Sequence, residues 1–186
     1  MEKVAVFGNA GGGKSTLSKR LSELTGLPLY SLDQVKDQAG NDEKYQQVHQ
    51  QLLVTQQWIM DGFGSMETLW PRLDVADSLI FVDLPLYRHF WWVTKRMLTG
   101  YFKPPEGWPE KSPIFKYSMS SYSVLLACHK YLNPKYREYI EKAKGVKQVY
   151  HLRSVEEILQ FLEFIEKETS HKIINRRQDA DSRTSP

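Results

Sequence analysis

A glycine-rich stretch near the N-terminus has the residue types and spacing of a phosphate-binding loop. Gly8, Gly13, Lys14 and Ser15 match the pattern G-x-x-x-x-G-K-[ST]. Glycines permit backbone angles that other residues avoid, so successive N–H groups can point inward and bind an anion. A lysine at this position reaches the β- and γ-phosphates of a nucleoside triphosphate, and the serine hydroxyl ligates Mg²⁺. We therefore expect this segment to bind ATP with Mg²⁺, with Lys14 also acting in catalysis.

The residues around this loop agree with that interpretation. An apolar run at 3–7 predicts a strand before the loop, and Leu17, Leu21 and Leu24 recur at helical spacing after it. The helix would add its positive N-terminal end to the phosphate site. The alternative is a glycine-rich turn with an accidental Gly-Lys-Ser, which the strand–loop–helix context disfavours. The predicted ATP contacts are Gly8, Asn9, Ala10, Gly11, Gly12, Gly13, Lys14, Ser15 and Thr16.

Acidic residues end three of the other predicted strands. Ligands of open α/β sheets gather at the carboxyl ends of the strands, where Asp33, Asp61 and Asp83 stand. Asp61 is the predicted second anchor for Mg²⁺, with a turn cap as the alternative. Asp33 would orient or deprotonate an acceptor hydroxyl in catalysis, or would cap a helix. Asp83 precedes a proline and is predicted to cap a helix.

Basic residues flank a proline-rich segment that we predict to be a lid, at about 101–120. Arg88 and Arg96 precede it on a predicted helix and would act in catalysis, because a guanidinium bonds phosphate oxygens bidentately. Arg137 follows the segment and Arg153 follows the last strand, and both are predicted nucleotide contacts. A solvated basic face is the alternative for all of them.

Strands alternate with helices along the chain, which predicts an α/β fold with a parallel sheet. The expected fold is that of a P-loop NTPase: a five-stranded parallel sheet, helices on both faces and a short lid. We expect a single domain at 1–168 and a disordered tail at 169–186. The strands are predicted at 3–7, 29–32, 58–60, 78–82 and 148–152.

The composition limits the remaining possibilities. The chain has 186 residues, a net charge of +3 and one cysteine, so no internal disulfide can form and a reducing cytoplasm fits. Its apolar runs are far shorter than the roughly 20 residues that span a bilayer, so no membrane partner is expected. The charge is too small to favour a nucleic-acid partner. The oligomeric state is left open.

Parts of the sequence resemble known kinases. Residues 58–63 resemble the adenylate kinase signature, an apolar strand followed by Asp-Gly-Phe-Pro-Arg, in which the aspartate helps to hold the water shell of the magnesium ion. This chain has Gly64-Ser65 where that family has Pro-Arg, which argues against AMP as the acceptor. Asp33 corresponds to the aspartate after the second strand of shikimate-kinase-like enzymes.

The whole layout is similar to a branch of the adenylate-kinase-like proteins, the DNA topology modulation proteins. The similarity covers about residues 1–166 and implies a P-loop kinase fold that binds ATP. Two functions follow. The first is a kinase that transfers the γ-phosphoryl group of MgATP to a small acceptor, such as a nucleoside monophosphate. The alternative is a nucleotide-gated regulatory ATPase that acts on DNA topology or on a partner protein. The matching segments are 8–16, 25–28, 32–33, 58–62, 81–85, 106–111 and 152–154.

Overall fold

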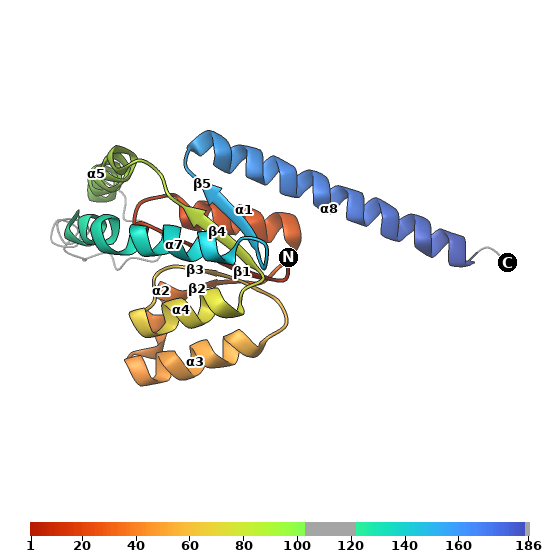
Figure 1. Cartoon of the computed structure of the whole chain (residues 1–186), viewed down its shortest axis with the longest axis horizontal. Coiled ribbons are helices and arrows are strands. Elements are labelled where there is room, and N and C mark those ends of the chain that lie inside the picture. Colours follow the sequence, from red (N-terminus) through yellow and green to blue (C-terminus); the bar gives the residue numbers. More distant parts are fainter. Residues whose placement is uncertain (103–121, 185–186) are drawn as a thin grey trace.

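The core of the molecule is a parallel sheet of five strands (Figure 1). The computed structural model describes residues 1–102 and 122–184, without the side chains of 96, 97, 99–102 and 172–184. All neighbouring strands pair in parallel, which confirms the predicted fold class. In spatial order the strands are β2 (Leu29–Ser31), β3 (Trp58–Asp61), β1 (Lys3–Gly8), β4 (Ser78–Val82) and β5 (Gln148–Leu152).

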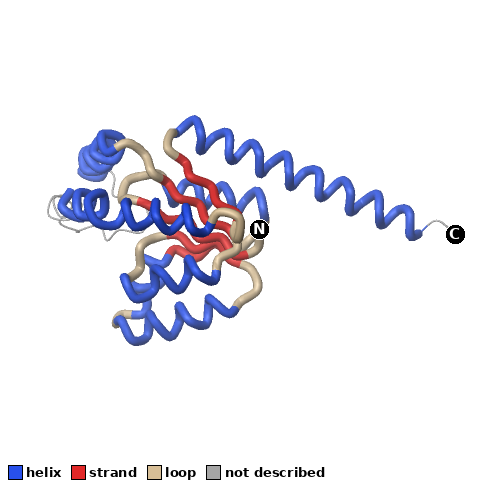
Figure 2. The backbone as a smooth tube through the Cα atoms, viewed as in Figure 1, coloured by secondary structure: helices blue, strands red, loops and turns tan. Residues whose placement is uncertain are grey.

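Helices cover both faces of this sheet (Figure 2). α1 and α8 pack on one face, whereas α4 and α7 pack on the other. The helices are α1 (Lys14–Thr25), α2 (Leu32–Ala39), α3 (Asp42–Val54), α4 (Met66–Val75), α5 (Leu86–Phe102), the π-helical segment η1 (Cys128–Leu132), α7 (Asn133–Ala143) and α8 (Val155–Thr184). In the part of the chain that the structure describes, no helix is both long and apolar enough to cross a bilayer.

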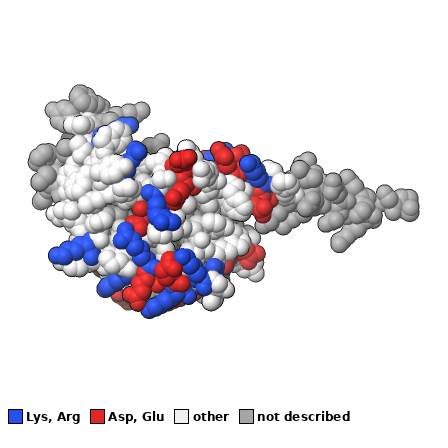
Figure 3. Space-filling view, turned by 45° about the horizontal axis from the view of Figure 1, so that its top comes forward, with Lys and Arg blue, Asp and Glu red and all other residues white. Residues whose placement is uncertain are grey.

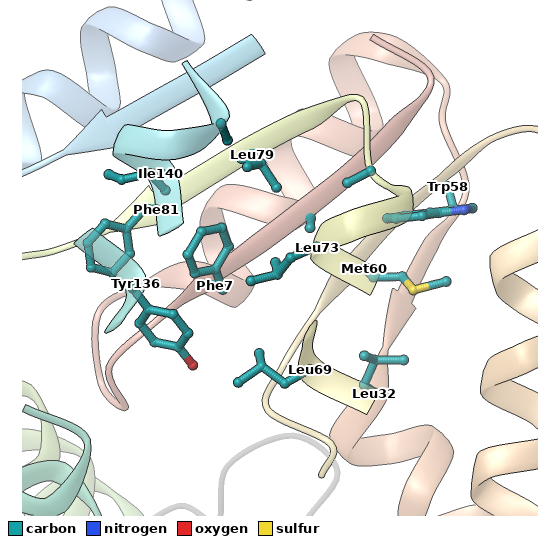
Figure 4. Close-up of a cluster of buried hydrophobic side chains, with 13 residues drawn as sticks. Phe7, Leu32, Trp58, Met60, Leu69, Leu73, Leu79, Phe81, Tyr136 and Ile140 are labelled. Carbon is teal, nitrogen blue, oxygen red and sulfur yellow. The ribbon is translucent and has the colours of Figure 1, made fainter. Parts of the chain in front are cut away.

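Strand β1 is apolar on both sides because both faces of the sheet are buried. Its alternate residues enter different clusters: Val4 and Val6 face α1 and α8, whereas Phe7 faces α4 and α7. The ring of Phe7 stacks on Phe81 with centroids 5.3 Å apart and meets the edge of Tyr136 at 5.0 Å (Figure 4). This packing fixes the end of β1, from which the glycine-rich loop begins.

The structure differs from the sequence-based expectation in two helices. α2 follows β2 directly, and its eight residues were not predicted as helix. α8 continues to Thr184, through the residues at 169–184 that were predicted to belong to a disordered tail. The polar sequence after residue 170 lacks an apolar stripe, but adding residues to an existing helix needs no new nucleation. The single-domain organisation stays a prediction, and residues 103–120 of the predicted lid lie outside the described residues.

Candidate active site

The glycine-rich loop takes a backbone path that only glycine can follow at its first position. Gly8, Gly11 and Gly13 have φ values of 136°, 66° and 74°. A Cβ atom on Gly8 would lie 2.1 Å from the carbonyl oxygen of Val82 in the neighbouring strand β4. The loop therefore leaves β1 in close contact with β4 and turns directly into α1.

Helix α5 supports this loop from outside. A Cβ atom on Gly13 would lie 2.9 Å from the ring of Trp92, and one on Gly12 would lie 3.1 Å from the ring of His89. His89 is fully buried, and its Nδ1 lies 2.7 Å from the carbonyl oxygen of Ala10. Because α5 occupies the outer side, the inner side of the loop is the one that a phosphate can approach.

Asn9 holds the loop to the helical residues 122–127. Its side chain is fully buried; Nδ2 donates to the carbonyl oxygen of Leu125 at 3.0 Å, and Oδ1 accepts from the N–H of Ala10 at 2.8 Å. Among the predicted ATP contacts, Asn9 therefore uses its side chain to position the loop. Its place in nucleotide binding stays a prediction for the backbone.

One cavity of about 280 Å³ brings together predicted residues from several elements. It lies at the carboxyl ends of β1, β2 and β3, where the strand order reverses and where ligands of such sheets bind. A larger cavity of about 560 Å³ lies at the opposite edge of the sheet, and the described residues that line it include no predicted site residue. We place the site in the smaller cavity because charged groups converge there. These are Lys14, Asp33, Asp61 and Arg72, with Gly11 and Ser15 beside them.

Lys14 is bound to the loop from which it projects. Its ammonium group donates to the carbonyl oxygen of Asn9 at 2.8 Å. Burial lowers the pKa of Lys14, and the nearby carboxylates of Asp61 and Asp33 partly oppose that effect. The lysine thus has carboxylate neighbours that favour its charged form.

Asp61 and Ser15 form a pair of oxygen ligands suited to Mg²⁺. Asp61 is 2% exposed and ends β3, and its Oδ1 accepts from the N–H of Gly62 at 2.7 Å. Ser15 is exposed in the first turn of α1 and lines the same cavity. Mg²⁺ prefers one or two protein oxygens together with substrate phosphates and water, so this donor set fits the ion.

Asp33 contacts the loop that follows Asp61. Its Oδ1 accepts from the N–H of Phe63 at 3.2 Å and from that of Gly64 at 3.0 Å. α2 begins at Leu32, so Asp33 lies within the first turn and the N-cap position belongs to Ser31. The alternative of a helix cap is therefore not what the structure shows, and the exposed carboxylate borders the cavity.

Asp83 joins three elements and does not act as the predicted helix cap. Its carboxylate accepts from Arg137 Nε at 2.8 Å, from His151 Nε2 at 2.9 Å and from Asn133 Nδ2 at 3.2 Å. Burial alone would raise the pKa of Asp83, but the hydrogen bonds from Arg137 and His151 lower it below its usual value. Arg137 is thus engaged with Asp83, and its predicted contact with the nucleotide stays a prediction.

The described residues that line the cavity do not include the remaining predicted arginines. Arg88 is exposed, with its guanidinium 5.7 Å from the centre of the Tyr87 ring. Arg153 is exposed just after β5, and its backbone N–H donates to Glu157 at 2.7 Å. The side chain of Arg96 lies outside the described part. Their roles stay predictions.

Sequence reasoning missed His89 and Arg72. His89 stands next to aromatic residues on a predicted helix, and nothing in its spacing indicates the contact with Ala10. Arg72 is 1% exposed and lies between Leu69 and Leu73 on the apolar face of α4. An arginine on an apolar helical stripe is the signal that could have identified it.

Comparisons with known proteins identify the fold of the chain but do not assign the chain to a family. No family profile matches the chain, and no curated protein matches it by sequence. Shikimate kinase from Acinetobacter baumannii, solved with shikimate, is 15% identical, covers 90% of this chain and 94% of its own, and superposes with a TM-score of 0.55.

Two further solved structures match with lower scores. They are shikimate kinase from Aquifex aeolicus (14% identity, 64% of this chain and 96% of that chain, TM-score 0.40) and a sugar kinase from Janibacter (15% identity, 89% and 90%, TM-score 0.41). The resemblance to the DNA topology modulation proteins stays a prediction. The chain has a P-loop NTPase fold similar to that of shikimate kinase.

Proposed function

We propose that this chain is a small-molecule kinase that transfers the γ-phosphoryl group of MgATP to an acceptor hydroxyl. One observation carries the proposal: the lysine and serine of the phosphate-binding loop line the same cavity as two carboxylates, Asp33 of α2 and Asp61 of β3. A site for nucleotide binding alone needs only the loop and the metal anchor. The second carboxylate, Asp33, gives the cavity a group that can act on an acceptor.

Each residue has a definite part in this reaction. When bound, MgATP supplies the phosphoryl group and the metal charge. Ser15 and Asp61 would hold the metal, and Lys14 neutralises charge on the phosphoryl oxygens. The acceptor oxygen forms a bond to the γ-phosphorus as the bond to the β,γ-bridging oxygen breaks, and Asp33 takes the hydroxyl proton. Arg88 and Arg96 are the lid cations of the proposal.

A small acceptor suits the cavity. Its volume of about 280 Å³ is at the low end for ligand sites and is shared with the end of the phosphate-binding loop. A nucleoside monophosphate is a candidate from the resemblance to adenylate kinases. A small hydroxylated metabolite is the other, and the solved neighbour bound to shikimate supports that class by its fold alone.

The test is release of ADP from MgATP across a panel of nucleoside monophosphates and small hydroxylated metabolites. We expect at least one compound to stimulate release and Lys14→Ala to lower kcat by at least about 100-fold, because a positioned charge next to the phosphates is lost. Lys19→Ala is the matched control, since Lys19 is exposed on the same helix. A folded Lys14→Ala variant with wild-type turnover would show the assignment to be wrong.

A further inference from the structure

Arg72 is a buried cation that borders the candidate site. It projects from α4, whose first turn is fixed by a capping box between Ser65 and Thr68. Leu69 and Leu73 on the same face are fully buried in the core, so the helix cannot turn to expose the arginine. Arg72 nevertheless lines the cavity together with Lys14.

Two hydrogen-bond donors of Arg72 are unused among the residues that the structure describes. Its Nε and Nη1 atoms are buried and have no hydrogen-bond partner within the described chain. The ion pairs found among the described residues do not include Arg72 either. Burying a charge without a partner is costly, and burial lowers the pKa of Arg72, although a guanidinium stays protonated in proteins. A buried guanidinium with unused donors is therefore suited to bind an anion.

Asp33 and Asp61, the carboxylates of the cavity, do not form an ion pair with Arg72. Oδ1 of Asp61 accepts from Gly62, and Oδ1 of Asp33 accepts from the loop at Phe63 and Gly64. Both acids act on Arg72 from a distance, without an ion pair. They favour the charged form of Arg72 but do not occupy its hydrogen-bond donors.

The nucleotide has its own cations and donors. Phosphates would meet Lys14 and the glycine loop, and the loop packs on α5. Arg72 comes from α4 instead, and its electrostatic neighbours include Tyr45 of α3 and Tyr136 of α7, although it also acts on Lys14.

We propose that Arg72 binds the anionic group, a carboxylate or a phosphate, of an acceptor whose hydroxyl faces Asp33. This assignment deepens the proposed kinase function and rests on it. It narrows the acceptor to small hydroxylated anions. A guanidinium presents donors in a fixed fork that matches both of these anions, so the chemistry is shared and the experiment must separate the two.

The experiment measures thermal unfolding of the full chain with the nucleotide site saturated by Mg²⁺ and a non-hydrolysable ATP analogue. Inorganic phosphate and acetate are the probes, at matched ionic strength, and acetamide is the neutral counterpart of acetate. The variants are Arg72→Gln and Arg72→Lys. Arg20→Gln is the matched control, because Arg20 lies on α1 and pairs with Glu23 outside the cavity.

We expect one of the two anions to raise the Tm of wild type and of Arg20→Gln by at least about 3 °C at tenfold its Kd. The rise should vanish in Arg72→Gln and shrink in Arg72→Lys, which keeps the charge but not the fork. A response to phosphate identifies a phosphorylated acceptor, and a response to acetate a carboxylated one. Acetamide should leave Tm unchanged.

Several results would overturn the assignment. They are no response of wild type to either anion, an equal response to acetate and acetamide, a response that survives in Arg72→Gln, and weaker binding of the ATP analogue as the only effect of the variant. If Arg72→Gln does not fold, Arg72→Lys and the comparison of acetate with acetamide still decide. If anion binding behaves as expected but no acceptor stimulates ADP release, the kinase function fails and the anion site stands.

Discussion

At the scale of single residues, the cavity holds two cations, Lys14 and Arg72, and two carboxylates, Asp33 and Asp61. Their formal charges cancel, so the residues alone offer a triphosphate little net attraction. The N–H groups of the glycine loop and a divalent cation must then supply most of the electrostatic stabilisation. This balance makes the metal anchor a sensitive point for mutation.

Asp61→Asn should separate metal binding from nucleotide binding. The amide keeps the shape of the side chain but removes the charge that holds the metal and its water. We expect affinity for the ATP analogue in EDTA to stay within about twofold, while the gain from Mg²⁺ falls by roughly tenfold. Titrations with and without Mg²⁺ measure both quantities. Asp37→Asn, an exposed acid on α2, is the control, and equal losses with and without Mg²⁺ would contradict the metal role.

His49 should make stability depend on pH. It is 2% exposed on α3, and burial, together with the charge of Arg72, lowers its pKa to about 4. The unfolded chain titrates this group near 6.5, so between pH 6.5 and 4 only the unfolded state holds the proton. The free energy of unfolding therefore falls as the pH drops through this window, by about 2 kcal/mol at pH 5 from His49 alone.

Urea denaturation at pH 7.5 and pH 5 tests this expectation. His49→Gln should lose about 2 kcal/mol less than wild type between the two pH values. His171→Gln, at an exposed position on α8, should behave like wild type. If His49→Gln shows the same pH dependence as wild type, another group is responsible.

The sequence predicts some site residues better than others, for physical reasons. The glycine loop is local, since its geometry follows from contiguous residues, and Asp33 and Asp61 follow from the rule that strand ends share one edge. Arg72 could not be assigned, because its neighbours come from α2, β3, α3 and α7 and its burial depends on how these elements pack. Asp83 was interpreted as a cap from its local context, but its partners Arg137 and His151 are distant in sequence.

At the scale of elements, α5 connects the phosphate-binding loop to the predicted lid segment. His89 lies with Nδ1 2.7 Å from the carbonyl oxygen of Ala10 and Nε2 3.1 Å from that of Leu84. Carbonyl oxygens only accept, so a neutral ring donates to one of them. A movement at the end of α5 would therefore be transmitted to the phosphate-binding loop through the ring of His89.

His89→Ala should weaken nucleotide binding without touching the nucleotide. The change leaves the carbonyl oxygen of Ala10 or of Leu84 without its donor and opens space beside Gly12. We expect a loss of about 1–3 kcal/mol in stability and about tenfold weaker binding of the ATP analogue. Thermal unfolding and analogue titration measure the two effects. His171→Ala is the control, and unchanged analogue affinity in a destabilised His89→Ala would refute the supporting role.

At the scale of the whole molecule, the chemistry gathers at one edge of the sheet, away from the outer part of α8 (Figure 1). On the face that Figure 3 shows, described Lys and Arg residues are interspersed with Asp and Glu, which is the pattern of an ordinary solvated surface. α8 contacts the core through Phe161 and Ile165 near its start. The rest of this helix projects beyond the sheet in Figure 1.

Removing residues 172–186 should therefore leave the folded domain intact. We expect Tm to change by less than about 2 °C and ADP release to be unaffected, because Phe161 and Ile165 are retained. Phe161→Ala in the full chain is the contrasting variant. Its ring is 5% exposed, so its loss should lower the free energy of unfolding by about 3–5 kcal/mol. A large drop in Tm on truncation would show that the end of α8 packs or associates in solution.

The hydrogen bonds from Phe63 and Gly64 to Asp33 have a consequence for how the two substrates influence each other. The segment that Asp33 holds begins immediately after Asp61, the proposed metal anchor, so one short stretch of backbone joins the acceptor side to the metal side. An acceptor that binds Asp33 alters the hydrogen bonds that hold this segment. The affinity of the site for the metal-bound nucleotide changes as a result. Thermodynamic linkage makes the effect reciprocal: each substrate must alter the dissociation constant of the other by the same factor. An enzyme whose two substrate sites are coupled in this way would show substrate synergism. One aspartate and two amide groups would then determine whether the two substrates bind in random or in fixed order.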